Sequence, residues 1–74
     1  MPYLVEKHND EESAKRAAKT NPPLGPGFPE EIVQRTVGLE IWGSRFGDPG
    51  GDWCDFLAFD ADGALIGERR ISGH

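Results

Sequence analysis

The chain has 74 residues, of which 36% are hydrophobic and 28% charged, and its formal net charge is −5 at pH 7. This length predicts a single domain over residues 1–74, whose fold buries about 60% of the surface that the unfolded chain exposes. The negative charge argues against direct contact with nucleic acid or an anionic membrane, because both of these repel an acidic protein. No apolar run approaches the about 20 residues of a membrane span, and the single cysteine allows no internal disulfide, so we expect a cytoplasmic protein.

Residues 1–20 predict a strand followed by a short helix. Residues 3–5 form an apolar run that favours a strand. Asn9 is a good N-cap residue, and Glu12 follows it at the spacing of a capping box. We expect the helix over residues 10–19, with acidic side chains in its first turn and basic ones later, as the helix dipole favours. Its apolar stripe consists of Ala14, Ala17 and Ala18.

The segment 21–29 holds four prolines and two glycines, a composition that excludes a helix and a central strand. We expect it to form a stiff crossing loop between the helix and the strands that follow. Leu24 and Phe28 are its large apolar residues, and both are predicted to hold the loop against the core.

The segment 29–36 is ambiguous between a helix and a strand. Pro29 followed by Glu30 and Glu31 resembles the start of a helix. Ile32 and Val33 favour a strand. We expect the chain to enter a strand between residues 32 and 36.

The C-terminal half predicts three antiparallel strands, over residues 36–46, 53–60 and 64–71. Apolar and polar residues alternate in the first of them, and residues 47–52 form a glycine-rich loop. Residues 60–63 predict a tight turn in which Gly63 takes the left-handed conformation. The fold class is therefore α+β: one short N-terminal helix packed on a small antiparallel β-meander of three strands, or of four if residues 3–5 join it.

Both faces of this sheet are predicted to be apolar, which an antiparallel sheet with one solvated face does not show. One face receives Trp42, Phe46, Trp53, Leu57, Phe59, Leu65 and Ile71, with Asp55 beside Arg69 as an ion pair. The other face receives Leu39, Ile41, Cys54, Phe56, Ala58 and Ile66. We expect the alanine-rich helix to cover the aromatic face. The second face is left to the crossing loop, to a second copy of the chain or to a partner.

The residue patterns favour neither catalysis nor a bound metal or cofactor. Residues 60–63 lack the carboxylates of a calcium loop, and residues 47–52 lack the Gly-Lys-Ser/Thr of a phosphate loop. Cys54 is better explained as a core residue than as a nucleophile, and no serine lies in a nucleophile elbow. We therefore expect a protein that is not an enzyme, with no catalytic, cofactor-binding or metal-binding residues.

The acidic residues concentrate in the segment 30–62, where eight acidic and two basic residues give a local net charge of −6. Most of them lie at the ends of the predicted hairpins, and two tryptophans flank the loop 47–52. A basic protein surface is the partner that such a charge distribution attracts. The candidate partner-binding residues are Glu40, Trp42, Asp48, Asp52, Trp53, Asp55, Asp60 and Asp62.

The leading hypothesis is a small acidic protein-interaction module that occupies the surface of another protein. In size, acidity and helix-plus-meander build, the chain is similar to small phage-encoded inhibitors, anti-CRISPR proteins among them. This resemblance is one of general character and implies an inhibitor that occupies a basic nucleic-acid-binding groove of its partner. The alternative is a homo-oligomeric structural or regulatory domain, for example a homodimer, that associates through the second face of its sheet.

Overall fold

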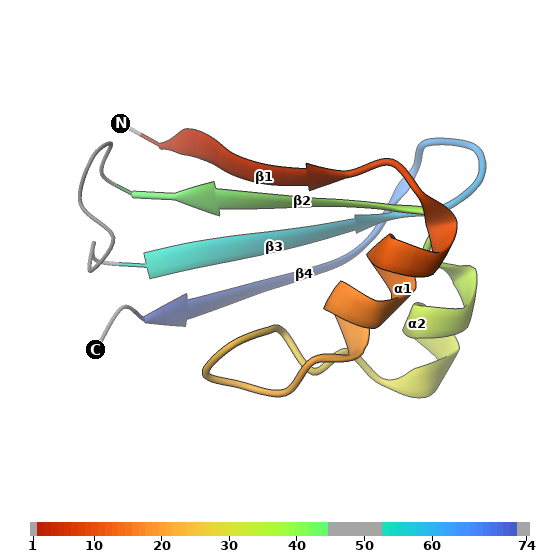
Figure 1. The fold of residues 1–74 in the computed structure, drawn as a ribbon, viewed down its shortest axis with the longest axis horizontal. Helices are drawn as coiled ribbons and strands as arrows, with labels where there is room; N and C mark the ends of the chain where they lie inside the picture. The colour runs from red at the N-terminus through yellow and green to blue at the C-terminus, as the bar shows by residue number, and fades with distance from the viewer. Residues whose placement is uncertain (1, 45–52, 73–74) are drawn as a thin grey trace.

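The structure is a computed structural model that describes residues 2–44 and 53–72. Six elements follow one another within these residues (Figure 1): β1 (Tyr3–His8), α1 (Glu11–Lys19), α2 (Glu30–Arg35), β2 (Gly38–Gly43), β3 (Trp53–Phe59) and β4 (Leu65–Ser72). The strands form one antiparallel sheet in the order β1-β2-β3-β4. The α+β class and the antiparallel meander are thus confirmed, and the N-terminal segment adds a strand.

Helix α1 begins one residue later than its capping pattern predicts. Asp10, not Asn9, is the N-cap, and its carboxylate accepts a hydrogen bond from the Ser13 N–H at 3.0 Å. Strand β1 extends to His8, so Asn9 still belongs to the connection between the two elements. The expected charge pattern is present, since Glu11 pairs with Lys15 and the next acidic residue pairs with Arg16 in the same i,i+4 geometry.

The cap gives a stability prediction with a matched control one residue away. Asp10→Ala removes the acceptor of the Ser13 N–H and should lower the free energy of unfolding by about 1 kcal/mol. Asn9→Ala should change it by less than about 0.5 kcal/mol, because Asn9 makes no capping bond. Urea unfolding followed by circular dichroism measures both. A larger loss in the Asn9 variant would contradict the assignment of the cap.

The segment that was expected to enter a strand forms helix α2 instead. The Ile32 and Val33 N–H groups donate to the Pro29 carbonyl at 2.9 and 3.0 Å, which closes the first turn. Val33 is buried in the core, and this burial outweighs the strand propensity of its β-branched side chain. The Lys15 ammonium closes the other end by donating to the carbonyls of Gln34 (2.8 Å) and Thr36.

The core lies in one layer between the sheet and the two helices. Its buried apolar residues come from both helices, the crossing loop, β2 and β3: Ala14, Ala18, Phe28, Val33, Leu39, Phe56 and Ala58. The expectation that α1 covers the aromatic face is therefore wrong. Small residues on the helix and on the sheet explain why α1 covers the other face. The alanines on α1 meet the side of the sheet that presents Ala58 and Gly67, so the backbones approach closely.

The crossing loop lies on this same side of the sheet. Pro26 is fully buried, and its carbonyl accepts a hydrogen bond from the Arg69 guanidinium at 3.1 Å. The Phe28 ring packs where a side chain at Gly67 would otherwise stand. Phe28 thus holds the loop to the core as expected. Leu24 does not, since 84% of its surface is exposed.

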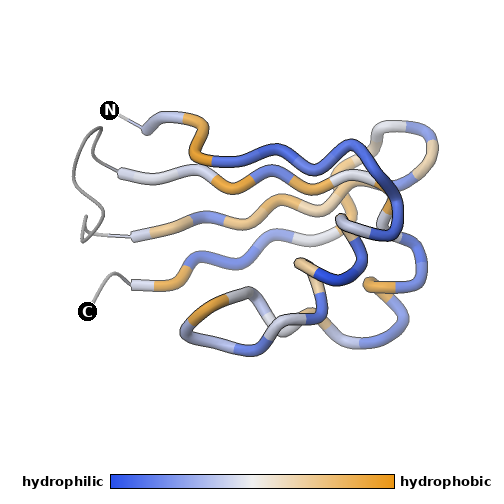
Figure 2. The backbone as a smooth tube through the Cα atoms, in the orientation of Figure 1, coloured by the Kyte–Doolittle hydropathy of each residue, from blue (hydrophilic) through white to orange (hydrophobic). Residues whose placement is uncertain are grey.

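Two bulges set the register of the edge strands. In β1 the pairing shifts between Leu4 and Glu6, and in β4 an extra residue, Ile66, interrupts the pairing opposite Ala58 and Phe59. Figure 2 shows hydrophobic residues concentrated on β2 and β3, whereas long parts of β1 and β4 are hydrophilic. Polar, bulged edges discourage the addition of further strands.

The bulge in β4 corrects two sequence-based assignments. Asp55 lies opposite Arg70, not Arg69, and Ile71 lies opposite Cys54. Directly opposed residues share a face, so Ile71 belongs to the helix side, where it packs against the core. A register shift of one residue moves every following side chain to the other face, which is why both assignments failed together.

Candidate protein interface

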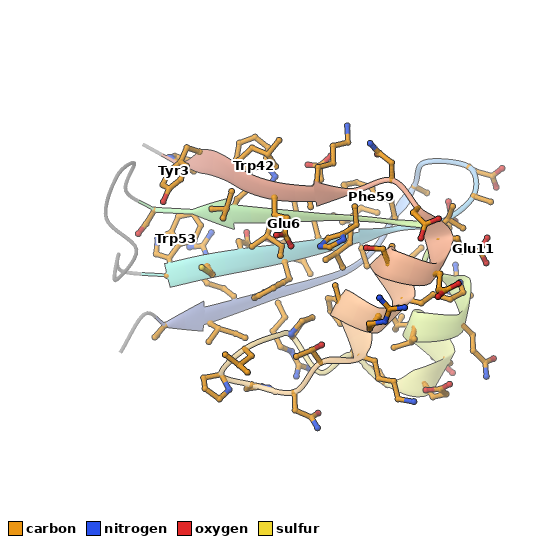
Figure 3. All side chains as sticks on the ribbon, in the orientation of Figure 1. Tyr3, Glu6, Glu11, Trp42, Trp53 and Phe59 are labelled. Atoms are coloured by element: carbon orange, nitrogen blue, oxygen red, sulfur yellow. The ribbon has the colours of Figure 1, made fainter. Side chains whose placement is uncertain are left out.

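The sheet face opposite the helices carries the large aromatic residues. We call it the open face and define it by the side chains that share the side of Trp42 in the register: Leu4, Lys7, Glu40, Trp42, Trp53, Asp55, Leu57, Phe59, Leu65, Glu68, Arg70 and Ser72. Figure 3 shows Trp42, Trp53 and Phe59 on the neighbouring strands β2 and β3. Among the described residues no helix or loop packs over this face, and 45% of Leu4 and 53% of Leu65 are exposed.

An ion pair and a cation–π contact organise the centre of the open face. The Arg70 guanidinium lies 3.4 Å from the Asp55 Oδ2 atom and stacks 3.8 Å from the centroid of the Trp53 ring. Asp55 is only 7% exposed, whereas half of the Arg70 side chain remains in solvent. The two contacts together fix the guanidinium over the indole.

The Asp55 carboxylate is only half satisfied. Its Oδ1 atom is buried and has no hydrogen-bond partner among the protein groups of the structure. A buried acceptor without a partner costs about 1–3 kcal/mol, so natural structures contain few of them. Less than 1 Å² of this oxygen is accessible, so the unmade bond is a cost that the fold itself bears.

Glu68 lies two residues before Arg70 on the same face, and Asp55 changes the pKa of its carboxyl group. The pKa of the Glu68 carboxyl is raised above its ordinary value, first by a hydrogen bond between its protonated form and Asp55 and next by the negative charge of Asp55. The Arg70 charge lowers it and offsets part of this effect. The Glu68 carboxyl therefore takes up a proton more readily than an isolated glutamate does.

Glu40 and Trp42 form a second pair on β2. The Trp42 indole Nε1–H donates to Glu40 Oε1 at 2.9 Å. This bond fixes the orientation of the indole on the sheet surface and leaves Glu40 as an acceptor beside it. Four of the predicted partner-binding residues, Glu40, Trp42, Trp53 and Asp55, are thus brought together on one face.

Two further predicted site residues, Asp60 and Asp62, lie at the turn between β3 and β4. Asp60 begins the turn between β3 and β4, where its Oδ1 atom accepts hydrogen bonds from the N–H groups of Asp62 (2.9 Å) and Ala64 (3.0 Å). Gly63 takes the left-handed conformation that the sequence predicts, with φ of 78°. Asp60 thus serves the turn, whereas Asp62 is exposed at its tip. Phe46, Asp48 and Asp52 lie outside the described residues.

Arg70 and Glu68 were not among the residues proposed for the interface. Their neighbour Gly67 carried the signal that could have revealed them, since a glycine inside a strand often marks a bulge. With the bulge placed at Ile66, the strand turns Glu68 and Arg70 toward Asp55.

A hydroxyl, an imidazole and a carboxylate form a row on the helix side of the sheet. Ser13 Oγ lies 2.5 Å from His8 Nδ1, and His8 Nε2 lies 2.6 Å from Glu6 Oε2. This is the order of a serine activated by a base. The amides beside the serine are occupied, because the Ser13 N–H donates to the Asp10 carboxylate and the Ala14 N–H donates to the Asp10 carbonyl. The N–H groups of residues 13 and 14 are therefore not free to stabilise an oxyanion beside the serine. The hydrogen bonds of the row instead connect β1 to the first turn of α1.

Cys54 and His8 do not form a nucleophile pair. Cys54 lies opposite Gly43 on β2, and His8 lies opposite Leu39. These two positions on β2 are four residues apart, about 13 Å along a strand. Within residues 2–44 and 53–72 no cluster of three or more His, Cys, Asp or Glu side chains could hold a metal ion. Neither described helix has the length and apolar character to cross a membrane.

Comparison with protein-family models, with curated proteins and with solved structures gives no match to this chain. The function is therefore argued from the geometry of the open face.

Proposed function

We propose that this chain is a non-enzymatic protein-interaction module that binds its partner through the open face. The observation that carries the proposal is the position of Trp42, Trp53 and Phe59 on the sheet face that the helices leave uncovered. Tryptophan, tyrosine, phenylalanine and arginine are enriched at the centres of protein interfaces, and Arg70 adds to the aromatic set.

The charge of the chain favours a basic partner. The net charge is −5, and the open face itself carries three carboxylates, Glu40, Asp55 and Glu68, against two cations, Lys7 and Arg70. A basic groove that normally binds nucleic acid has the complementary sign. The proposed role is inhibition by occupying such a groove, as in phage-encoded inhibitors of the anti-CRISPR kind.

The size of the module fits a docking role. Its two longer dimensions are 31 and 20 Å, and the sheet lies across them. A stable interface of standard size buries about 800 Å² on each partner, which is comparable to one broad face of this chain.

A different partner is preferred over a second copy of the chain. The face that the sequence assigned to self-association contains Leu39, Phe56 and Ala58, and all three are buried under the helices and the crossing loop. Self-association would have to use the open face instead. Two copies at −5 each repel one another, whereas a basic partner is attracted.

The test compares the open face with an apolar residue on the helix side. Tagged protein is incubated with lysate of the producing organism, and captured proteins are identified by mass spectrometry at low and high salt. Trp42→Ala with Trp53→Ala should lose the captured partner, whereas Leu24→Ala, at an apolar residue that is 84% exposed, should retain it. Capture should weaken with ionic strength, because screening reduces electrostatic attraction.

Equal capture by the tryptophan and leucine variants, or no specific capture at all, would contradict the proposal. Light scattering on a size-exclusion column completes the test, and we expect the mass of a monomer. A dimer that the tryptophan substitutions dissociate would identify a second copy as the occupant of the open face.

A further inference from the structure

We propose that a hollow at one end of the open face holds an aromatic side chain of the partner. The hollow lies where the end of β1 and the start of β2 meet the turn between β3 and β4 (Figure 1), and its lining includes Lys7, Asn9, Gly38, Glu40, Phe59 and Gly63. This inference rests on the proposed function and gives the docking face an anchor point. The ligand is defined by its chemistry: the uncharged ring of a phenylalanine, a tyrosine or a tryptophan.

A glycine forms the floor of the hollow. Gly38 lies opposite Phe59 in the sheet, and opposed residues share a face, so this position without a side chain belongs to the open face. Apart from the chain neighbours of Gly38, the described residues bring only two atoms within 4 Å of the point where its Cβ would stand. These are the His8 carbonyl oxygen at 3.7 Å and the Phe59 Cβ atom at 4.0 Å. The Phe59 ring therefore stands beside the gap and does not cover it.

The fold does not require a glycine at this position. Both contacts of the added Cβ would be ordinary van der Waals contacts. The glycines with positive φ in the described part of the chain are Gly27 and Gly63, so the backbone of Gly38 suits any residue. A strand glycine that no turn or clash demands often marks a place where another molecule approaches closely. The space over Gly38 is thus available to a ligand.

The size and the wall of the hollow fit a single ring. Its volume is about 370 Å³, near the lower end of the range of about 300–1,000 Å³ that small-ligand pockets cover. The Phe59 side chain forms one wall and is only partly buried, so an arriving ring can reach it. Aromatic rings favour offset-stacked and edge-to-face contacts with one another, so Phe59 prefers an aromatic occupant to an aliphatic one.

The charges around the hollow favour an uncharged occupant. Lys7 lies directly opposite Glu40 on the same face, and the Asp60 carboxylate lies 4.0 Å from the Arg35 guanidinium. Opposite charges of the chain thus neighbour one another at the rim, and the hollow offers no excess charge to a cation or an anion. A basic partner is attracted by the acidic chain as a whole and inserts an apolar ring at this point.

A nucleic-acid-binding groove contains side chains of this kind. Such grooves combine basic residues with aromatic side chains on which the bases stack. An aromatic side chain held in the hollow cannot stack on a base, so its capture would block the groove as the proposed inhibition requires. Trp42 is four residues from Gly38 on β2, about 13 Å along the strand, so one partner can contact both.

The test uses N-acetyl-tyrosinamide as the probe and the amide NMR spectrum of the intact chain as the signal. We expect the largest shifts at the amides of Gly38, Phe59 and Gly63. Gly38→Val fills the hollow and should weaken binding of the probe at least fivefold. Ser72→Val is the matched control, because it adds a valine to the same face opposite Trp53, about 20 Å from Phe59 along β3. We expect it to weaken binding less than twofold, and the spectrum verifies that each variant is folded.

Two related probes test the chemistry of the occupant. N-acetyl-leucinamide and N-acetyl-argininamide carry the same backbone groups with an aliphatic and a cationic side chain. Each should bind the hollow at least fivefold more weakly than the tyrosine probe. Phe59→Leu keeps an apolar wall but removes its ring, so it should reduce the preference for the tyrosine probe over the leucine probe.

The inference is overturned if the tyrosine probe does not shift the three amides, or if Gly38→Val and Ser72→Val weaken its binding equally. Equal binding of the arginine probe at the hollow would also overturn it. A dimer that Gly38→Val dissociates would place a side chain of a second copy in the hollow and contradict a different partner.

Failure of this inference is distinguishable from failure of the proposed function. Loss of partner capture in the tryptophan variants, together with no binding of the tyrosine probe, would reject only the aromatic anchor. Probe binding that Gly38→Val removes, together with capture that does not depend on Trp42 and Trp53, would reject only the docking role of the tryptophans.

Discussion

Phe56→Ala should unfold the protein or remove most of its stability, whereas Phe59→Ala should leave it folded. The two phenylalanines lie on the same strand but on opposite faces of the sheet. Phe56 is 5% exposed and belongs to the core, whereas Phe59 is only partly buried on the open face. Truncation of a core phenylalanine costs about 3–5 kcal/mol, and a domain of this length has a total stability of about 4–11 kcal/mol.

The comparison tests which face the helices cover. Thermal unfolding of both variants gives the difference in stability, and we expect the Phe59 variant to lose less than half as much as the Phe56 variant. If the helices covered the aromatic face, the order would be reversed. Equal losses would mean that both faces are covered, which would leave no open face for a partner.

Gly25→Ala should destabilise the protein by about 2–3 kcal/mol, because overpacking at a rigid site forces the backbone to move. A Cβ atom at this position would lie 2.5 Å from the Thr20 carbonyl oxygen and 2.6 Å from the Thr20 Cβ atom. Neither neighbour can move freely, since the same carbonyl accepts a hydrogen bond from the Gly27 N–H at 2.7 Å. The entropic gain from replacing glycine in the unfolded chain, about 0.4–1 kcal/mol, is too small to offset the clash.

Gly38→Ala is the control for this substitution. The nearest atoms to its Cβ would be the His8 carbonyl oxygen at 3.7 Å and the Phe59 Cβ atom at 4.0 Å, which are ordinary contacts. We expect no loss of stability there, and urea unfolding measures both variants. A neutral Gly25→Ala would show that the crossing loop does not pack against the end of α1 as closely as described.

Local chemistry in the sequence was sufficient for several elements. The acidic and basic ends of α1, its i,i+4 ion pairs and the turn that Gly63 completes all depend on residues within a few positions of one another. Such interactions act in any short segment, so their sequence patterns are reliable. The alternation of side chains along β2 and β3 likewise separated the two sheet faces before their surroundings were known.

The position of the cap and the nature of α2 show where local patterns fail. Asn9 and Asp10 are equally good capping residues, and the length of β1 decided between them. Ile32 and Val33 favour a strand in isolation, but Val33 is buried in the core and the Pro29 carbonyl accepts two amides of the turn. Contacts with distant parts of the chain decided both cases.

The sequence by itself determined that both sheet faces are apolar, that the chain is acidic and that Trp42, Trp53 and Asp55 share one face. Only the tertiary structure decided which face the helices cover. The covered face depends on the helix and the sheet together. The alanines on α1 fit the side of the sheet where Ala58 and Gly67 allow close approach. The same holds for the site: a single extra residue in β4 brings Arg70 to Asp55, and strand pairing, not local sequence, fixes where that residue lies.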